Sequence, residues 1–287
     1  MKKYVVVDDI YDSNGLLLAA KGMEISTEKL VKLKRLGLEE KAIEQVVSEK
    51  KVPVNDPEVK NTTKFGLDNT IDEFMACLDL FAEKVKGIDL KDFNYCSDLL
   101  TELLFDRKAN WRMPLIALAN YADWVYTHSI NVAILSLMIG KALGYKERDL
   151  HILGLSAILH DVGYLLIPKS LMFESNHFND IVQQHCELGK ALLDDFPVKE
   201  VCKDVVLQHH ERLDGSGYPN GLESEEINPY TKIVMVADAF DSMTTERPYG
   251  KTMSQEIAVK KLQSMVAKYD RSVVSIFIDI LNPSKFH

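Results

Sequence analysis

The chain has 287 residues, of which 27% are charged and 46% hydrophobic, the balance of an ordinary globular protein with its own core. Its 34 basic residues are outnumbered by 43 acidic ones, and the net charge of −9 argues against binding to duplex nucleic acid or to an anionic membrane. The sequence shows neither a C-x-x-C pair, nor a signal peptide, nor an apolar stretch long enough to span a bilayer. It therefore predicts a cytoplasmic protein with reduced cysteines.

The first fifty residues (1–50) predict a small α+β domain. Short apolar runs at 4–7 and 16–20 flank the turn sequence YDSNG, which is typical of a hairpin. A helix is expected to begin behind the Ser-Thr pair at 26–27 and to end at Gly37.

Residues 51–66 carry two prolines, mixed charges and no apolar period, so we interpret them as a linker. Beyond the linker, apolar residues recur at steps of three and four, which predicts helices almost throughout 67–287. The expected helices are 67–86, 92–105, 114–120, 129–143, 148–160, 180–195, 198–210, 229–243 and 254–267. The predicted fold class is mainly α: a helical domain preceded by the small α+β domain.

Titratable side chains occupy unusual places in these helices. The stretch DLHILGLSAILHDVG is apolar nearly all round and predicts a buried helix, yet its end carries His160 and Asp161. Burying an imidazole and a carboxylate is costly unless they are paired, and a hydrogen bond of His160 to Asp161 or to a backbone carbonyl explains this pair taken alone. Similar residues occupy other apolar helices or their ends: His128, His185, His209, His210 and Asp238.

Together these seven side chains point to metal binding. Imidazole and carboxylate groups suit borderline divalent transition metals, and seven ligands are too many for one ion. We therefore expect a two-metal site, with ions about 3.5–4 Å apart and a water between them. For the whole set this interpretation is favoured over a group of core histidines.

The order of these residues, with HDVG at 160–163 and HHERLDGSGYP at 209–219, resembles the HD-GYP branch of the HD phosphohydrolases. These are bacterial enzymes that hydrolyse the signalling dinucleotide cyclic di-GMP. The resemblance covers roughly 95–280 and extends to VADAFDSMTTERPYGK and KYDRSVVSIF. Several motifs in the same order make it specific, although HD alone is a weak signal.

The resemblance implies that Asp161 bridges two ions, which are commonly iron or manganese in the family. It implies two further ligand sets: His128, His160 and Asp238 for one ion, and His185, His209 and His210 for the other. Some members bind a third ion through a glutamate one helical turn before the first histidine. Trp124 stands at that position here, so the resemblance implies two ions.

The resemblance also suggests substrate contacts. Gly217 and Tyr218 belong to a loop that would follow the substrate groove, although turn chemistry explains its glycines equally well. Arg247 and Lys251 offer a bidentate fork and a point charge for a phosphodiester, and solvated charges at a helix end are the alternative. The expected partners are cyclic di-GMP and, through the Gly-Tyr-Pro loop, signalling proteins, while a homodimer is left open.

One position departs from the family pattern. The family usually reads His-Asp-x-Gly-Lys, and here Tyr164 replaces the lysine, so a phenol stands where the resemblance implies a positive charge. Losing one such stabiliser typically costs about 10²–10³ in rate. The prediction is a two-metal phosphodiesterase that converts cyclic di-GMP to linear pGpG, slowly, with Asp161 and Tyr164 at its catalytic centre. The alternatives are a cyclic di-GMP receptor or scaffold that hydrolyses little, and a phosphohydrolase for another nucleotide.

Overall fold

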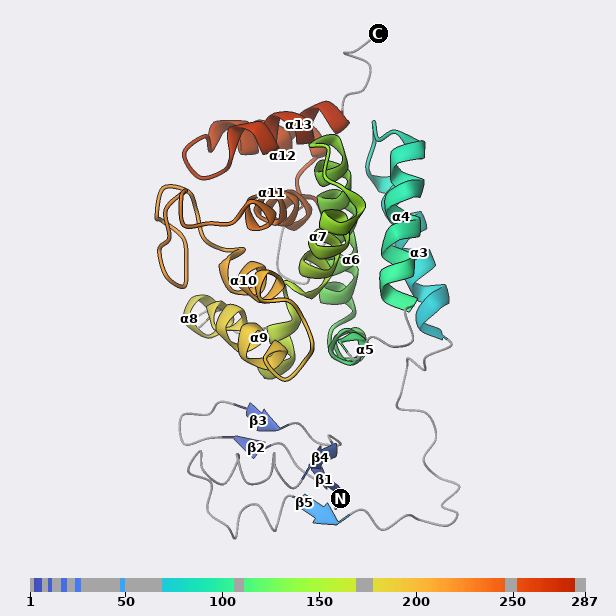
Figure 1. The fold of residues 1–287 in the computed structure, drawn as a ribbon, viewed down its shortest axis with the longest axis vertical. Coiled ribbons are helices and arrows are strands. Elements are labelled where there is room, and N and C mark those ends of the chain that lie inside the picture. Colours follow the sequence, from blue (N-terminus) through green and yellow to red (C-terminus); the bar gives the residue numbers. More distant parts are fainter. Residues whose placement is uncertain are drawn as a thin grey trace. The chain divides into compact units, whose positions relative to one another are not determined.

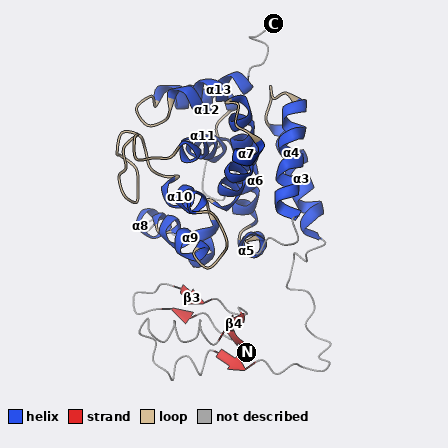
Figure 2. Ribbon diagram, viewed as in Figure 1, coloured by secondary structure: helices blue, strands red, loops and turns tan. Residues whose placement is uncertain are grey.

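The computed structural model describes five short strands and most of the chain from residue 69 onward. The described residues are 3–6, 10–11, 17–19, 24–26, 47–49, 69–105, 111–168, 178–245 and 252–281. They divide into two compact units. The smaller unit holds the five strands and the described part of 166–182, and the larger unit holds the remaining helices. Among the described residues, strands occur only in the smaller unit (Figure 2).

The strands of the smaller unit form two antiparallel sheets. In one, β1 (Lys3–Val6) lies between β4 (Glu24–Ser26) and β5 (Val47–Glu49). In the other, β2 (Ile10–Tyr11) pairs with β3 (Leu17–Ala19).

The predicted pairing of 4–7 with 16–20 is therefore wrong. Tyr4 pairs with Ile25 and Glu49, and the hairpin is made by the two-residue strand β2 instead. A strand of two residues is too short to show an alternating period. The longer apolar run at 4–7 therefore predicted the first strand of the hairpin, in place of β2. The predicted helix after 26–27 and the linker at 51–66 lie outside the described residues, so the α+β character of this domain stays a prediction.

The larger unit is mainly helical, which confirms the predicted fold class of this domain. The described helices of the larger unit are α3 (Asn69–Lys84), α4 (Leu90–Phe105), α5 (Arg112–Tyr121), α6 (Asp123–Ala142), α7 (Glu147–Leu159), α9 (His185–Leu193), α10 (Glu200–Gln208), α11 (Pro229–Thr244), α12 (Gln255–Ser264) and α13 (Arg271–Leu281). The 3-10 helix η1 (Val162–Leu166) follows α7, and α8 (Phe178–Gln183) belongs mostly to the smaller unit. The helix predicted over 180–195 is interrupted at Gln184, which separates α8 from α9. The C-terminal helix α13 lay beyond the helices expected from the sequence.

Helix α6 lies at the centre of the larger unit and contacts α3, α4, α5, α7, α11 and α13 (Figure 1). Residues 132–139 are all buried, as expected for a helix that is apolar nearly all round. Gly140 lets α7 approach closely, because a Cβ there would lie 2.6 Å from Leu153 Cδ2. No helix in the described part of the chain is both long and apolar enough to cross a membrane.

Helix α11 shows how local sequence positions the site. Asn228 caps the helix by accepting a hydrogen bond from Thr231 N, and Pro229 occupies the first turn, where a missing N–H costs nothing. The helix packs against α6 and α10, and it carries Asp238 and Asp241 into the interior.

Candidate metal centre

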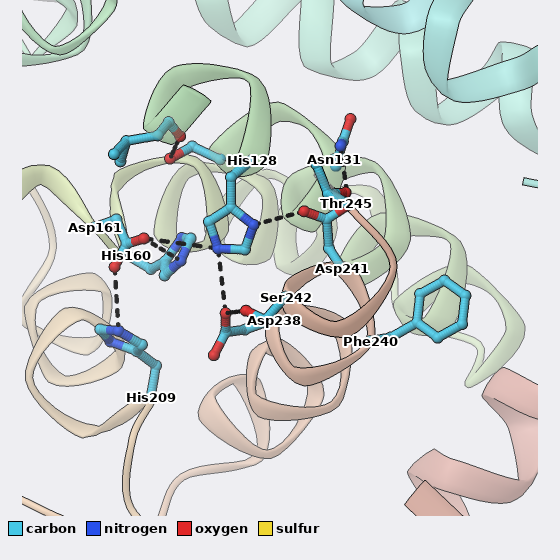
Figure 3. A network of polar contacts seen from close by, with 12 residues as sticks. His128, Asn131, His160, Asp161, His209, Asp238, Phe240, Asp241, Ser242 and Thr245 are labelled. Atoms are coloured by element: carbon cyan, nitrogen blue, oxygen red, sulfur yellow. Dashed lines mark hydrogen bonds and ion pairs between the residues drawn. The ribbon is translucent and has the colours of Figure 1, made fainter. Parts of the chain in front are cut away.

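All seven predicted ligands meet at one place inside the larger unit. His128 lies in α6, His160 ends α7 with Asp161 next to it, His185 begins α9, His209 and His210 end α10, and Asp238 lies in α11. Six of the seven are buried, and His210 is partly exposed. Segments more than a hundred residues apart thus bring their imidazoles and carboxylates into a single cluster. Figure 3 labels His128, His160, Asp161, His209 and Asp238 of this cluster.

Asp161 lies between two groups of imidazoles. Its Oδ2 is 3.3 Å from His160 Nε2 and 3.6 Å from His128 Nε2. Its Oδ1 is 3.3 Å from His185 Nε2 and 3.5 Å from His209 Nε2. Each carboxylate oxygen therefore faces its own pair of nitrogen ligands, the arrangement that a carboxylate bridging two ions requires.

In the described part of the chain, three groups of ligand atoms are close enough to hold an ion, and two of these groups form the two halves of the cluster. Those of His128, His160 and Asp238 lie within 4.8 Å of one another, and so do those of His185, Cys186, His209 and His210. Atoms that bind one ion at about 2.0–2.3 Å are roughly 3–4 Å apart. These two groups contain the residues of the two ligand sets that the family resemblance implied, with Cys186 in addition. A third group, His160, Asp161 and His209, joins the two halves through Asp161, so the assignment of ligands to each ion stays a prediction.

Hydrogen bonds from the outer ring nitrogens to backbone carbonyls orient two of the imidazoles. The Nδ1 of His160 donates to Ala157 O at 2.7 Å, and the Nδ1 of His209 donates to Val206 O at 2.8 Å. Because a carbonyl only accepts, each Nε2 is left with a lone pair directed into the cluster. His160 Nε2 is buried and has no hydrogen-bond partner, an unsatisfied group that a metal ion would satisfy.

The two carboxylates of the cluster are held in their charged form. Burial alone would raise the pKa of Asp161, but in the metal-free cluster the imidazoles of His160, His209 and His185, when protonated, outweigh burial and hold this pKa well below its usual range. The pKa of Asp238 is lowered in the same way, against burial, by His128 and His210. Metal ligands must be deprotonated, so the donor set fits divalent cations.

Asp241 is a buried residue of this site that the sequence analysis missed. Its Oδ2 accepts a hydrogen bond from His128 Nδ1 at 2.6 Å, and its Oδ1 accepts from Asn131 Nδ2 at 2.9 Å and from Thr245 Oγ1 at 2.6 Å. Figure 3 shows His128 between Asp241 on one side and Asp161 and Asp238 on the other. The available signal was the spacing of Asp238 and Asp241, which places both on one face of α11.

Residues 112–273 match the family model described as the HD domain. The chain belongs to the HD-domain family. The doublet that gives the family its name is His160-Asp161, the pair at the middle of the cluster.

Curated relatives confirm the resemblance to the HD-GYP branch. A cyclic di-GMP phosphodiesterase of Pseudomonas aeruginosa is 30% identical over 194 residues, 65% of this chain and 47% of the relative. A cyclic di-GMP phosphodiesterase of Thermotoga maritima is 33% identical over 171 residues, 57% of this chain and 46% of the relative. The chain thus matches about half the length of these relatives.

A solved structure has the same fold. Bd1817, a HDG"Y"P protein from Bdellovibrio bacteriovorus, superposes with a TM-score of 0.50 over 98% of this chain and 94% of its own, at 20% sequence identity. At that identity the likeness concerns the fold alone.

The Gly-Tyr-Pro loop of this HD domain is tied to the histidine pair that precedes it. Glu211, a second buried residue that the sequence analysis missed, accepts hydrogen bonds from Asn220 N at 2.7 Å and Leu222 N at 3.0 Å. Tyr218 N donates to His210 O at 3.2 Å, and the two rings lie 4.8 Å apart between centroids. The loop is therefore held beside the cluster by its own backbone and by one buried carboxylate.

Gly217 has a structural reason to be glycine. A Cβ at Gly217 would lie 2.3 Å from Glu211 Cα and 2.4 Å from Arg212 N, so the loop's close approach is to its own backbone. This accounts for the glycine without a ligand, and the substrate contacts of Gly217 and Tyr218 stay predictions.

We expect Gly217→Ala to destabilise the HD domain by roughly 2–3 kcal/mol, because backbone atoms cannot move aside as a flexible side chain can. Gly215→Ala is the matched control in the same loop. Gly215 has a φ of +74°, but a Cβ added there would lie 3.5 Å from its nearest neighbour, Gly221 O. The alanine at this position therefore adds only backbone strain of about 1 kcal/mol. Urea unfolding of the two variants measures the difference, and equal midpoints would contradict the proposed clash.

Tyr164 lies against the cluster as part of η1. Its ring stacks on His185, with centroids 4.6 Å apart and an interplanar angle of 13°, and meets the edge of Trp124 at 6.2 Å. The residue that replaces the usual lysine therefore packs on a predicted ligand. Arg247 and Lys251 lie outside the described residues, so their contacts with a phosphate stay predictions.

Proposed function

We propose that this HD domain is a two-metal phosphodiesterase that hydrolyses cyclic di-GMP to the linear dinucleotide pGpG. The observation that carries the proposal is the pair of buried ligand groups joined by the two oxygens of Asp161. The named activity of the Pseudomonas aeruginosa and Thermotoga maritima relatives supports the choice of substrate. Because the chain spans only half of those proteins, the activity is assigned to the HD domain that it shares with them.

The proposed ligand assignment follows the two groups. One ion would be held by His128, His160 and Asp238, and the other by His185, His209 and His210. Asp161 would bind both ions. Iron or manganese suits such imidazole and carboxylate ligands. When bound, the two ions would supply an activated water and neutralise charge on the phosphoryl oxygens. Asp241 and the carbonyls of Ala157 and Val206 keep three imidazoles aimed at the cluster.

The exposure of the ligands indicates how a phosphodiester would enter. The side chain of His210 is 20% exposed, whereas those of the other six ligands are at most 6% exposed. Tyr218 lies against His210, so substrate would approach past the Gly-Tyr-Pro loop. Arg247 and Lys251 would bind the phosphate, and Tyr164 would donate a hydrogen bond to it. Arg247→Ala would then act mainly on KM.

The second candidate is a receptor or scaffold that binds cyclic di-GMP, or protein partners through the loop, with little turnover. The absence of a lysine at position 164 favours this alternative. The test is to incubate metal-loaded protein with cyclic di-GMP, cyclic GMP-AMP and linear pGpG and to separate the products by chromatography. Accumulation of pGpG from cyclic di-GMP supports the phosphodiesterase. Tight binding with no product after prolonged incubation supports the receptor.

We expect Tyr164→Lys to raise kcat about tenfold, which corresponds to about 1.4 kcal/mol of transition-state stabilisation, because an ammonium beside the phosphate restores the missing charge. The change also removes the ring stacked on His185, so metal content is measured on the same samples. Tyr164→Phe keeps the ring and removes the hydroxyl, which separates packing from hydrogen bonding. An unchanged kcat in fully metal-loaded Tyr164→Lys would show that this position does not reach the substrate.

A further inference from the structure

Cys186 is a member of the cluster that neither the sequence analysis nor the proposed mechanism uses. Its side chain is fully buried, and its sulfur lies within 4.8 Å of the ligand atoms of His185, His209 and His210. Cys186 Sγ is 3.5 Å from His185 Nε2, and His185 Nε2 is 3.1 Å from His209 Nε2. These are the separations found between atoms that bind one ion at about 2.0–2.3 Å.

We propose that Cys186 is a thiolate ligand of the ion held by His185, His209 and His210. The inference rests on the proposed function in that it requires a metal ion at this cluster. It makes the two halves of the site chemically different: nitrogen and sulfur ligands on the Cys186 side, nitrogen and oxygen ligands on the His128 side, and Asp161 shared between them.

The packing of α9 holds the sulfur in place. A Cβ at Gly163 would lie 1.9 Å from His185 O and 2.6 Å from Gly189 N, so the first turn of α9 is pressed against the turn that follows Asp161. On the ring side, Tyr164 stacks on His185. With backbone and ring both held, Cys186 Sγ and His185 Nε2 stay directed toward the same point.

The chemistry balances without a redox partner. As the metal–sulfur bond forms, the S–H bond breaks and the proton passes to bulk water, so neither an oxidant nor a reductant is consumed. A thiolate is a softer ligand than imidazole or carboxylate and favours Zn²⁺ or Co²⁺ over Mn²⁺. The Cys186 half should therefore discriminate against Mn²⁺ more strongly than the His128 half does.

The competing explanation is a thiol that only donates a hydrogen bond to the His185 ring. Cys202 provides a matched control, because it is also fully buried but its sulfur faces Ile152 O at 3.8 Å, and it belongs to none of the ligand groups found among the described residues.

The test is to load metal-free full-length protein with Co²⁺ and to record sulfur-to-cobalt charge-transfer absorption, together with X-ray absorption for a sulfur neighbour at about 2.3 Å. Wild type and Cys202→Ala should show both signals, and Cys186→Ala and Cys186→Ser should lose both. The affinity of this half for Zn²⁺ should fall at least about tenfold in Cys186→Ala, while its affinity for Mn²⁺ changes less than about threefold.

The outcomes separate this inference from the proposed function. Wild-type protein that binds two Co²⁺ ions and shows no sulfur signal overturns the thiolate ligand and leaves the phosphodiesterase standing. Protein that binds no metal at all overturns both. If the Cys186 variants fail to fold by circular dichroism, the wild-type spectra alone decide, because the sulfur signals do not depend on a variant.

Discussion

Asp161→Asn is expected to release both metal ions and to abolish phosphodiester hydrolysis. The two oxygens of Asp161 lie 3.3–3.6 Å from four imidazole nitrogens, two on each side. An amide has the same shape but no charge, and its nitrogen carries two hydrogens that point at ligand atoms instead of offering a lone pair. Because both halves of the cluster depend on this one side chain, we expect turnover to fall at least about 10³-fold.

Elemental analysis of protein purified without chelators, together with the hydrolysis assay, measures this result. Asp194→Asn is the control, since Asp194 forms an ion pair with Lys203 at 2.8 Å at the surface, away from the cluster, and such pairs contribute little to stability. The control should keep its metals and its rate. Asp161→Asn protein that retains about two ions per chain would rule out the bridging role.

Asp241→Ala is expected to lower metal affinity about 10–100-fold on the His128 side, although Asp241 is not itself a proposed ligand. Its loss leaves His128 Nδ1 and Asn131 Nδ2 without their buried acceptor, so the imidazole can rotate or change tautomer and turn its lone pair away from the ion. Unpaired buried donors also cost about 1–3 kcal/mol each, so the unfolding midpoint should fall as well.

Competition with a chelator measures the metal affinity, and Asp241→Asn separates the two contributions of the side chain. Its remaining oxygen can still accept from His128, so this variant should lose less affinity than Asp241→Ala and should keep most of the stability. Equal metal affinity in wild type and Asp241→Ala would contradict the positioning role. The HD domain would then hold His128 by packing alone.

Much of the helical unit could be predicted from the sequence because the signals are local. The spacing of three and four residues between apolar side chains can be read from the local sequence of each helix without knowing its packing partners. The helix predicted at 229–243, for example, agrees closely with α11. The interruption at Gln184 is less visible, since Gln184 itself keeps a helical backbone conformation. The strand pairing was wrong for the opposite reason: an apolar run indicates a strand and carries no information about its partner.

The candidate ligands were visible in the sequence by themselves, because a charged or imidazole side chain in an apolar helix is costly unless something satisfies it. The places of Asp241, Glu211 and Cys186 beside the cluster or its loop were decided only by the tertiary structure. Asp241 acts on His128, 113 positions away in the chain, and Cys186 becomes notable only where α9 and α10 bring three imidazoles to its sulfur. Such contacts arise from helix packing between distant segments, and no local spacing encodes them. The reason for Gly217 was likewise hidden, because a loop folding onto its own backbone and a loop lying along a ligand require the same small residue.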